Sequence, residues 1–279
     1  MMQLLRIELY KIFKRPRTYI SFLTVTAICA LIELALFTNG QEFMDFFLQG
    51  LNDQFEMGGN LLNGYLVTFV ILGLLLVHVP LLVALVSGDA LAGEAGAGTL
   101  RLLLTKPVSR TKVVLAKYFA AVVYSIALLV WLAIMALGLS LLIFGTGDLA
   151  YGKSEEVVIL LRNDILWRYA CAFGFAALAM AVVSALSIFL SALSENPIGP
   201  IVGTMGVIIV LTIVTNLDIP LFNSIKPYLF TTHMLGWKGF FSDPVPSAAI
   251  TRSVIVLGSY IIGLLGLTIF LFKKKDIQS

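Results

Sequence analysis

The sequence predicts an all-α integral membrane protein with six transmembrane helices and both termini in the cytoplasm. Of its 279 residues, 59% are hydrophobic and 13% are charged, and the mean hydropathy is +0.98. A soluble domain is about 45 to 50% apolar and about 25% charged. The composition therefore excludes an ordinary soluble fold.

Six stretches are long and apolar enough to cross a membrane, which takes about 20 residues for a hydrocarbon core roughly 30 Å thick. They cover residues 19–38, 64–87, 117–144, 169–193, 199–217 and 253–272. Basic residues precede the first stretch, as in a signal peptide. That stretch is longer than the about 7 to 15 residues of a signal-peptide core, and no small-residue cleavage site follows it, so we expect a retained span. The connecting segments are too short for a soluble domain of roughly 50 residues or more, which predicts one membrane domain over residues 1–279.

The distribution of Lys and Arg predicts the orientation. Basic residues gather before the first span, in the second loop (residues 88–116) and after the last span: Arg6, Lys11, Lys14, Arg15, Arg17, Arg101, Lys106, Arg110, Lys112, Lys273, Lys274 and Lys275. The first loop carries acidic residues and no Lys or Arg: Glu42, Asp45, Asp53 and Glu56. The positive-inside rule therefore places both termini and the second loop in the cytoplasm. The net charge of +3 reports orientation, and we expect no nucleic-acid partner.

Two cytoplasmic segments are expected to form short helices at the membrane surface. Residues 1–17 alternate Leu and Ile with Lys and Arg, a pattern typical of an interfacial amphipathic helix. In the second loop, four glycines would loosen the backbone, Thr99 would cap a helix, Pro107 would end it, and Ser109 would cap the next. The pattern alone leaves open whether this loop docks on a partner or lies among the lipid headgroups.

No catalytic, cofactor or metal site is expected in the chain. The run "GDLAYGKS" (147–154) matches the phosphate-binding motif G-x-x-x-x-G-K-[ST]. It follows a span on the predicted outer face, without the strand and helix that such a loop needs, so we interpret it as a solvated turn. The motifs of zinc peptidases and serine hydrolases are absent from the sequence. Glu33 and His78 lie inside spans and are candidates for a substrate pathway, because an ionisable group at that depth should face the protein interior or a wet cavity.

The second loop also resembles a known family. The pattern "GE-x-x-x-GTLRLLL-x-x-P-V-S-R" is similar to the cytoplasmic loop of ATP-binding-cassette (ABC) transporter permeases of the type-2 export class, as are the six spans and the basic N-terminal segment. The resemblance implies that residues 88–116 form a coupling loop resting on a separate ATPase subunit. The residues that match the docking element and the turn after it are Glu94, Gly98, Thr99, Leu100, Arg101, Leu103, Pro107, Ser109 and Arg110.

The resemblance further implies the partners and the location. We expect two ATPase subunits that bind ATP and Mg²⁺, a second copy of this chain or a homologue, and membrane lipid around a multi-pass protein of a prokaryotic cytoplasmic membrane. The alternative function is an ion-coupled secondary carrier or a channel, which would use charged residues along the spans. The sequence selects no substrate.

The outer loops are expected to contact the membrane interface. Residues 43–55 place phenylalanines among acids, which predicts a short helix on the outer leaflet. The fifth loop is rich in aromatic residues and proline and is similar to the re-entrant hairpin of the family. Aromatic belts at the interface occur in most membrane proteins, so the sequence leaves open whether residues 228–241 act as a gate or belong to such a belt.

The topology can be tested with single cysteines in a chain lacking Cys29 and Cys171. A cysteine at Asp53 or Lys153 should react with an impermeant thiol reagent in intact cells, whereas one at Lys106 should react only after the membrane is opened. Labelling at position 106 in intact cells would reverse the orientation.

Overall fold

The protein is largely helical, and six of its helices have the length and apolarity of membrane spans. The computed structural model describes residues 1–48, 62–105, 107–153, 156–217 and 219–274, without the side chains of residues 41–48, 101, 103, 104, 153, 156 and 157. Within them, the membrane-length helical segments are Pro16–Gly40, Gly64–Gly96, Arg110–Phe144, Arg162–Leu193, Ile198–Asn216 and Ser247–Lys274. The prediction of a multi-pass helical membrane protein is confirmed at this level.

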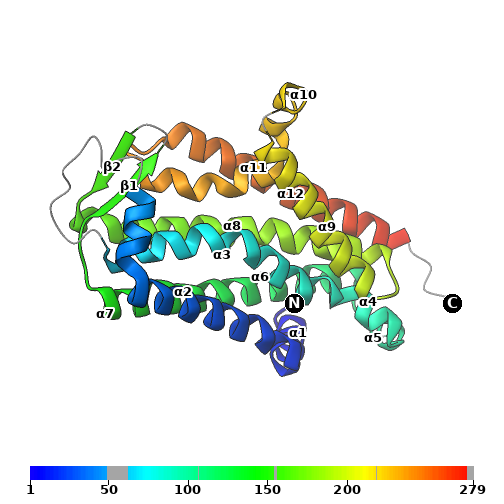
Figure 1. The fold of residues 1–279 in the computed structure, drawn as a ribbon. Helices are drawn as coiled ribbons and strands as arrows, with labels where there is room; N and C mark the ends of the chain where they lie inside the picture. Colours follow the sequence, from blue (N-terminus) through cyan, green and yellow to red (C-terminus); the bar gives the residue numbers. More distant parts are fainter. Residues whose placement is uncertain (49–61, 106, 154–155, 218, 275–279) are drawn as a thin grey trace.

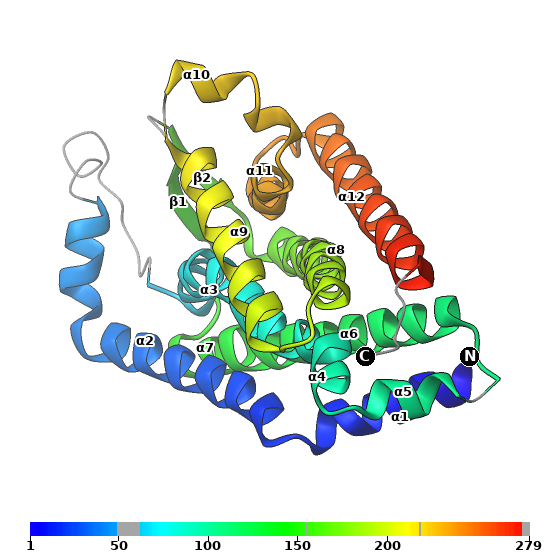
Figure 2. The ribbon, with the colours of Figure 1, turned by 90° about the vertical axis from the view of Figure 1, so that its right-hand side faces the viewer.

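Helix α8 (Arg162–Leu193) lies at the centre of the bundle. It packs against α3 (Gly64–Ser87), α6 (Arg110–Ala133), α9 (Ile198–Asn216) and α12 (Ser247–Lys274), as Figure 2 shows. Tyr169 on α8 is fully buried, stacks on Tyr65 of α3 and donates a hydrogen bond of 2.6 Å to the Tyr65 carbonyl. The polar tip of this large side chain is thus satisfied inside the bundle.

The three basic segments lie together at one end of the molecule. This charged end carries α1 (Met2–Lys14), α4 (Asp89–Gly96), α5 (Thr99–Leu104) and the last turn of α12 (Figure 1). The opposite end, called here the hairpin end, carries α7 (Ser140–Phe144) and the two strands. The arrangement places both described chain ends on one side of the bundle, and the cytoplasmic position of that side stays a prediction.

The hairpin end contains a β-hairpin that the expectation of an all-α chain missed. Strands β1 (Leu149–Lys153) and β2 (Glu156–Leu160) pair antiparallel, with Leu149 opposite Leu160. Five residues of the motif "GDLAYGKS", 149–153, thus form a strand that pairs with β2, whereas a phosphate loop follows a strand and opens a helix. Ser154 lies outside the described residues. Tyr151 fastens the hairpin to the bundle by donating a hydrogen bond of 2.8 Å to the Phe241 carbonyl.

Two helices depart from regular geometry at the hairpin end. Helix α2 (Pro16–Leu48) is kinked at Asn39, and its continuation over residues 41–48 overlaps the predicted outer helix, of which residues 49–55 lie outside the described chain. Between α6 and α7, residues Ile134–Leu139 form a π-helical turn, η1. Thr68 of α3 donates a hydrogen bond of 3.0 Å to the Ala136 carbonyl inside that turn.

The fifth loop folds back into the bundle. Its elements are α10 (Pro220–Asn223), η2 (Lys226–Tyr228), α11 (Phe230–Met234) and η3 (Leu235–Phe241). Trp237 and Phe241 are buried, and Arg168 of α8 donates hydrogen bonds of 2.8 Å to the carbonyls of Phe240 and Ser242. Helices α11 and η3 therefore belong to the packed core, whereas Leu221 of α10 and Tyr228 of η2 are 75% and 70% exposed. A gating role for this loop stays a prediction.

Gly64 provides a test of the contact between α3 and the π-helical region. A β-carbon at Gly64 would lie 2.7 Å from the Ser140 carbonyl oxygen and from the Leu141 α-carbon, whereas Gly73 on the same helix has no neighbour within 4 Å. Gly64→Ala should cost about 1 to 3 kcal/mol of stability, because backbone atoms must move. Gly73→Ala should be neutral or stabilising by up to about 1 kcal/mol. Equal midpoints of thermal unfolding in detergent for the two variants would refute this contact.

Candidate functional site

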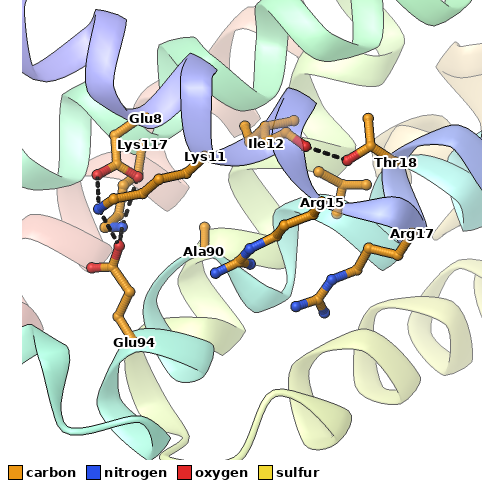
Figure 3. Close-up of a pocket in the computed structure, with 10 residues that line it drawn as sticks. Glu8, Lys11, Ile12, Arg15, Arg17, Thr18, Ala90, Glu94 and Lys117 are labelled. Carbon is orange, nitrogen blue, oxygen red and sulfur yellow. Dashed lines mark hydrogen bonds and ion pairs between the residues drawn. The ribbon is translucent and has the colours of Figure 1, made fainter.

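A cluster of four charged side chains joins three elements at the charged end. Glu8 of α1, Glu94 of α4 and Lys117 of α6 are buried, and Lys11 of α1 is half-buried (Figure 3). The Lys117 Nζ lies 2.9 Å from Glu8 Oε2 and 2.8 Å from Glu94 Oε1. The Lys11 Nζ lies 2.9 Å from Glu8 Oε1 and 2.7 Å from Glu94 Oε1. Two ammonium groups thus neutralise two carboxylates in this charge cluster.

Lys117 is the central member of the charge cluster because its side chain is only 1% exposed. Its neighbours on α6, Val114 and Tyr118, are also buried, so the sequence places an ammonium group on an apolar helix face. An ion in such surroundings is tolerated only when its charge is paired and its hydrogen bonds are made. Lys117 therefore requires α1 and α4 to lie where Glu8 and Glu94 reach it.

Lys11 keeps its charge for the same reason. Burial by itself would lower the pKa of the Lys11 ammonium, but hydrogen bonds and Coulomb attraction to Glu94 and Glu8 outweigh burial and raise the pKa above its ordinary value. The contribution of the charged Lys11 to stability is thus fully present at neutral pH, and it is lost as the pH rises through that elevated pKa.

A second ionic contact fixes the start of α2. Arg15 and Arg17 both reach the carboxylate of Asp89, whose side chain is 2% exposed, and the Arg17 Nη2 lies 2.8 Å from Oδ2. Asp89 is in the first turn of α4, where the helix dipole also favours a negative charge. Both arginines point from the α1–α2 junction toward α4 (Figure 3).

The glycines of the second loop allow close packing. A β-carbon at Gly93 would overlap the Asp89 carboxylate, and one at Gly96 would lie 2.8 Å from the Glu195 carbonyl oxygen. Both residues are helical, and among the glycines of this loop Gly98 alone has a positive φ, of 70°. The expectation that the glycines loosen this backbone is therefore wrong for Gly93 and Gly96, because bulk at these positions is excluded by the neighbouring polar groups.

The sequence predicts two helix N-caps in the second loop, and the structure confirms one of them. Ser109 is the N-cap of α6 and accepts a hydrogen bond from the Lys112 amide, as predicted. Thr99 does not act as the predicted cap: it is the first residue of α5, and its hydroxyl donates at 3.3 Å to the Glu94 carbonyl. The break between α4 and α5 comes instead from the left-handed conformation at Gly98.

The expected docking residues fall into separate groups. Glu94 is tied to Lys11 and Lys117, and Leu100 is 3% exposed, packing against Leu91 and Val114. Leu102 is 68% exposed. The side chains of Arg101 and Leu103 lie outside the description. Pro107 and Ser109 are exposed, and Arg110 donates a hydrogen bond of 2.9 Å to the Phe272 carbonyl near the end of α12.

Sequence reasoning missed most partners of Glu94 in the charge cluster. The missed residues that make ionic contacts here are Glu8, Lys11, Arg15, Arg17, Asp89 and Lys117. One signal was available: Lys117 stands on a helix face otherwise occupied by Val, Leu and Ala, and such a lysine needs an acidic partner.

The two pathway candidates have different surroundings. Glu33 is 2% exposed and accepts a hydrogen bond of 2.8 Å from Ser140, which confirms that it faces the interior. His78 is exposed on α3, and its Nδ1 lies 2.7 Å from the Leu74 carbonyl oxygen of the same helix. His78 therefore does not face the interior of this chain, and the expectation that it faces a wet cavity stays a prediction.

The residues that the structure describes do not form a metal site. Among those residues, no group of three or more His, Cys, Asp and Glu side chains lies close enough to hold a metal ion. The chemistry available at the charge cluster is therefore ionic contact between helices.

Lys117→Met tests the charge cluster. Loss of the ammonium leaves two buried carboxylates with Lys11 alone, which should cost about 3 to 5 kcal/mol and lower the midpoint of thermal unfolding. Lys112→Met, at an exposed position on the same helix, is the matched control and should leave the midpoint unchanged. Adding Glu8→Gln and Glu94→Gln to Lys117→Met should restore part of the loss, and a triple variant less stable than Lys117→Met would contradict the ionic explanation.

Comparison with known proteins places the chain in a family. The profile of a family described as "Protein of unknown function (DUF2705)" matches residues 15–278. The chain is also similar to a protein of Bacillus subtilis (strain 168) described as "Uncharacterized protein YhcI", with 24% identity over 202 residues. That match covers 70% of this chain and spans 63% of the length of the relative. Because the family profile covers nearly the whole chain, the chain belongs to the DUF2705 family.

Proposed function

We propose that this chain is the membrane permease subunit of an ABC exporter and that the second loop transmits the action of a separate ATPase subunit to the spans. The observation that carries the proposal is the anchoring of α4 to both α1 and α6 by the charge cluster, directly beside the short helix α5. A force applied to α5 would reach the third span through Glu94 and Lys117.

The exposed part of α5 is suited to contact a partner. Leu102 lies at the tip of the charged end and is 68% exposed, whereas Leu100, two residues earlier, is buried. Leu100 thus packs inside this chain, whereas Leu102 is available to contact a partner. In the proposed complex, Leu102 and Arg101 enter a cleft of the ATPase, which supplies the ATP and Mg²⁺ sites.

A second copy of the chain, or a homologue, would complete the transport pathway. Large apolar side chains are exposed along α2 and α9, among them Leu23, Leu34, Val202 and Val210. His78 on α3 is exposed at a depth where a polar ring would otherwise face lipid. A second copy that covers α2, α3 and α9 would remove this polar group from the lipid and would place it in a wet pathway between the copies.

An ion-coupled secondary carrier is the second candidate. The observation that favours it is Glu33, a buried carboxylate within a membrane-length helix. The two candidates differ in their need for an ATPase partner, so assembly with such a subunit separates them.

The proposal predicts a complex with an ATPase. We expect the neighbouring reading frame to encode an ATPase with a phosphate loop, and its co-expression with this chain to give a membrane complex that hydrolyses ATP. Leu102→Asp should weaken the complex because it buries an unpaired charge in an apolar contact. Arg101→Ala should weaken it by about 2 to 5 kcal/mol if the guanidinium pairs with the partner.

The matched control is Leu161→Asp, at a leucine that is also 68% exposed and that precedes α8 near the hairpin end. It should leave co-purification and ATP hydrolysis unchanged. Full assembly and full activity of the complex with Leu102→Asp would show that α5 is not the docking element, and absence of any complex in the unsubstituted chain would favour the carrier.

A further inference from the structure

Glu33 is a buried carboxylate without a basic partner. It lies on α2, is 2% exposed, and its Oε1 accepts one hydrogen bond of 2.8 Å from the Ser140 hydroxyl. Its Oε2 is also buried and has no hydrogen-bond partner among the described residues. No described Lys, Arg or His forms an ion pair with it.

Hydrogen-bond donors on the helices packed around α2 are already paired with other acceptors. The Thr68 hydroxyl is within hydrogen-bond distance of two carbonyls, those of Gly64 at 2.6 Å and Ala136 at 3.0 Å. The Trp131 indole donates to Thr26 at 2.9 Å. The backbone is also tightly packed at Gly64, where α3 touches Ser140 and Leu141. A negative charge on Glu33 would therefore rest on a single neutral hydrogen bond.

The ionisable groups of the helices packed against α2 do not compensate this charge. The sequences of η1 and α7 contain none. On α3, Tyr65 stacks on Tyr169 and His78 is exposed, and on α6 the ionisable groups end at Tyr124, several turns before Ser140. Those of α1 lie at the charged end. The Cys29 thiol, one turn earlier on α2, supplies no positive charge.

Glu94 is the informative comparison within the same chain. It is likewise buried, at 6% exposure, and its Oε2 is likewise without a partner among the described groups. Glu94, however, lies within 2.7 and 2.8 Å of two ammonium groups, which stabilise its charged form. Glu33 has no such cation, so the physical means of neutralising it is a proton on the carboxyl group itself.

We propose that Glu33 is a proton-binding site, occupied when α2 is seated on the π-helical turn η1. In this state Oε2 carries the proton and Oε1 accepts the Ser140 hydrogen bond. When α2 separates from η1 and water reaches the carboxyl group, the O–H bond breaks heterolytically, the proton passes to water and the carboxylate remains. Proton occupancy is thus linked to the contact between α2 and η1, independently of whether an ATPase drives the protein.

Infrared spectroscopy of the purified full chain in a detergent without ester or carboxyl groups tests the proton directly, because lipid ester carbonyls absorb in the same region. The unsubstituted protein at neutral pH should show the carbonyl stretch of a protonated carboxylic acid, and Glu33→Gln should abolish that band. Glu94→Gln is the matched control and should leave the band in place, because Glu94 is ionised. A spectrum without this band, or one in which Glu33→Gln leaves it unchanged, would overturn the proposal.

The dependence of stability on pH provides a second test. A folded state that binds a proton more tightly than the unfolded chain loses stability as the pH rises, and a glutamine at position 33 removes this dependence. The midpoint of thermal unfolding of the unsubstituted protein should therefore fall more between about pH 6 and about pH 8 than that of Glu33→Gln. Glu33→Gln should itself fold, because the amide is neutral and close in shape to the protonated acid. Parallel pH profiles of the two proteins would contradict the proposal.

Discussion

The ion pairs of Lys117 are the constraint on which the charged end depends. The ammonium group is held inside the protein, and its two carboxylate partners come from α1 and α4, which are distant in the sequence. A buried ion pair adds little net stability over an apolar contact of the same shape, whereas breaking it by removing one partner is costly. The pairs therefore restrict α1, α4 and α6 to arrangements in which both Glu8 and Glu94 reach Lys117.

The fold was predictable where a single physical rule acts along the chain. Membrane spans follow from about 20 consecutive apolar residues, a local property, and the six predicted stretches fall within the six helical segments to within a few residues. The hairpin at 149–160 was not predictable by this rule because its strands are short and follow a span. The π-helical turn depends on contacts such as that between Thr68 and Ala136, which no local pattern encodes.

Only those features of the candidate site that depend on residues close in the sequence were predictable. Ser109 as a helix cap is a matter of neighbouring residues, and its cap was confirmed. The partners of Glu94 were missed because its ion pairs with Lys11 and Lys117 join different helices and depend on how those helices pack. The glycines were misinterpreted for the same reason. Gly93 is as compatible with a loose segment as with a close approach until the Asp89 carboxylate is placed beside it.

The two buried glutamates show two means of neutralising a carboxylate. At the charged end, the long side chains of lysines reach Glu94 and pair with it. Near Ser140 no described cation forms an ion pair with Glu33, so the compensating charge is a proton. Helices α1 and α2 are thus attached to the bundle in two ways. Ionic contacts of Glu8, Arg15 and Arg17 attach them to α4 and α6, and a neutral hydrogen bond of Glu33 attaches α2 to Ser140. Because salt screens buried ion pairs only weakly, whereas pH controls the protonation of Glu33, a change of pH near neutrality acts on the second attachment and leaves the first in place.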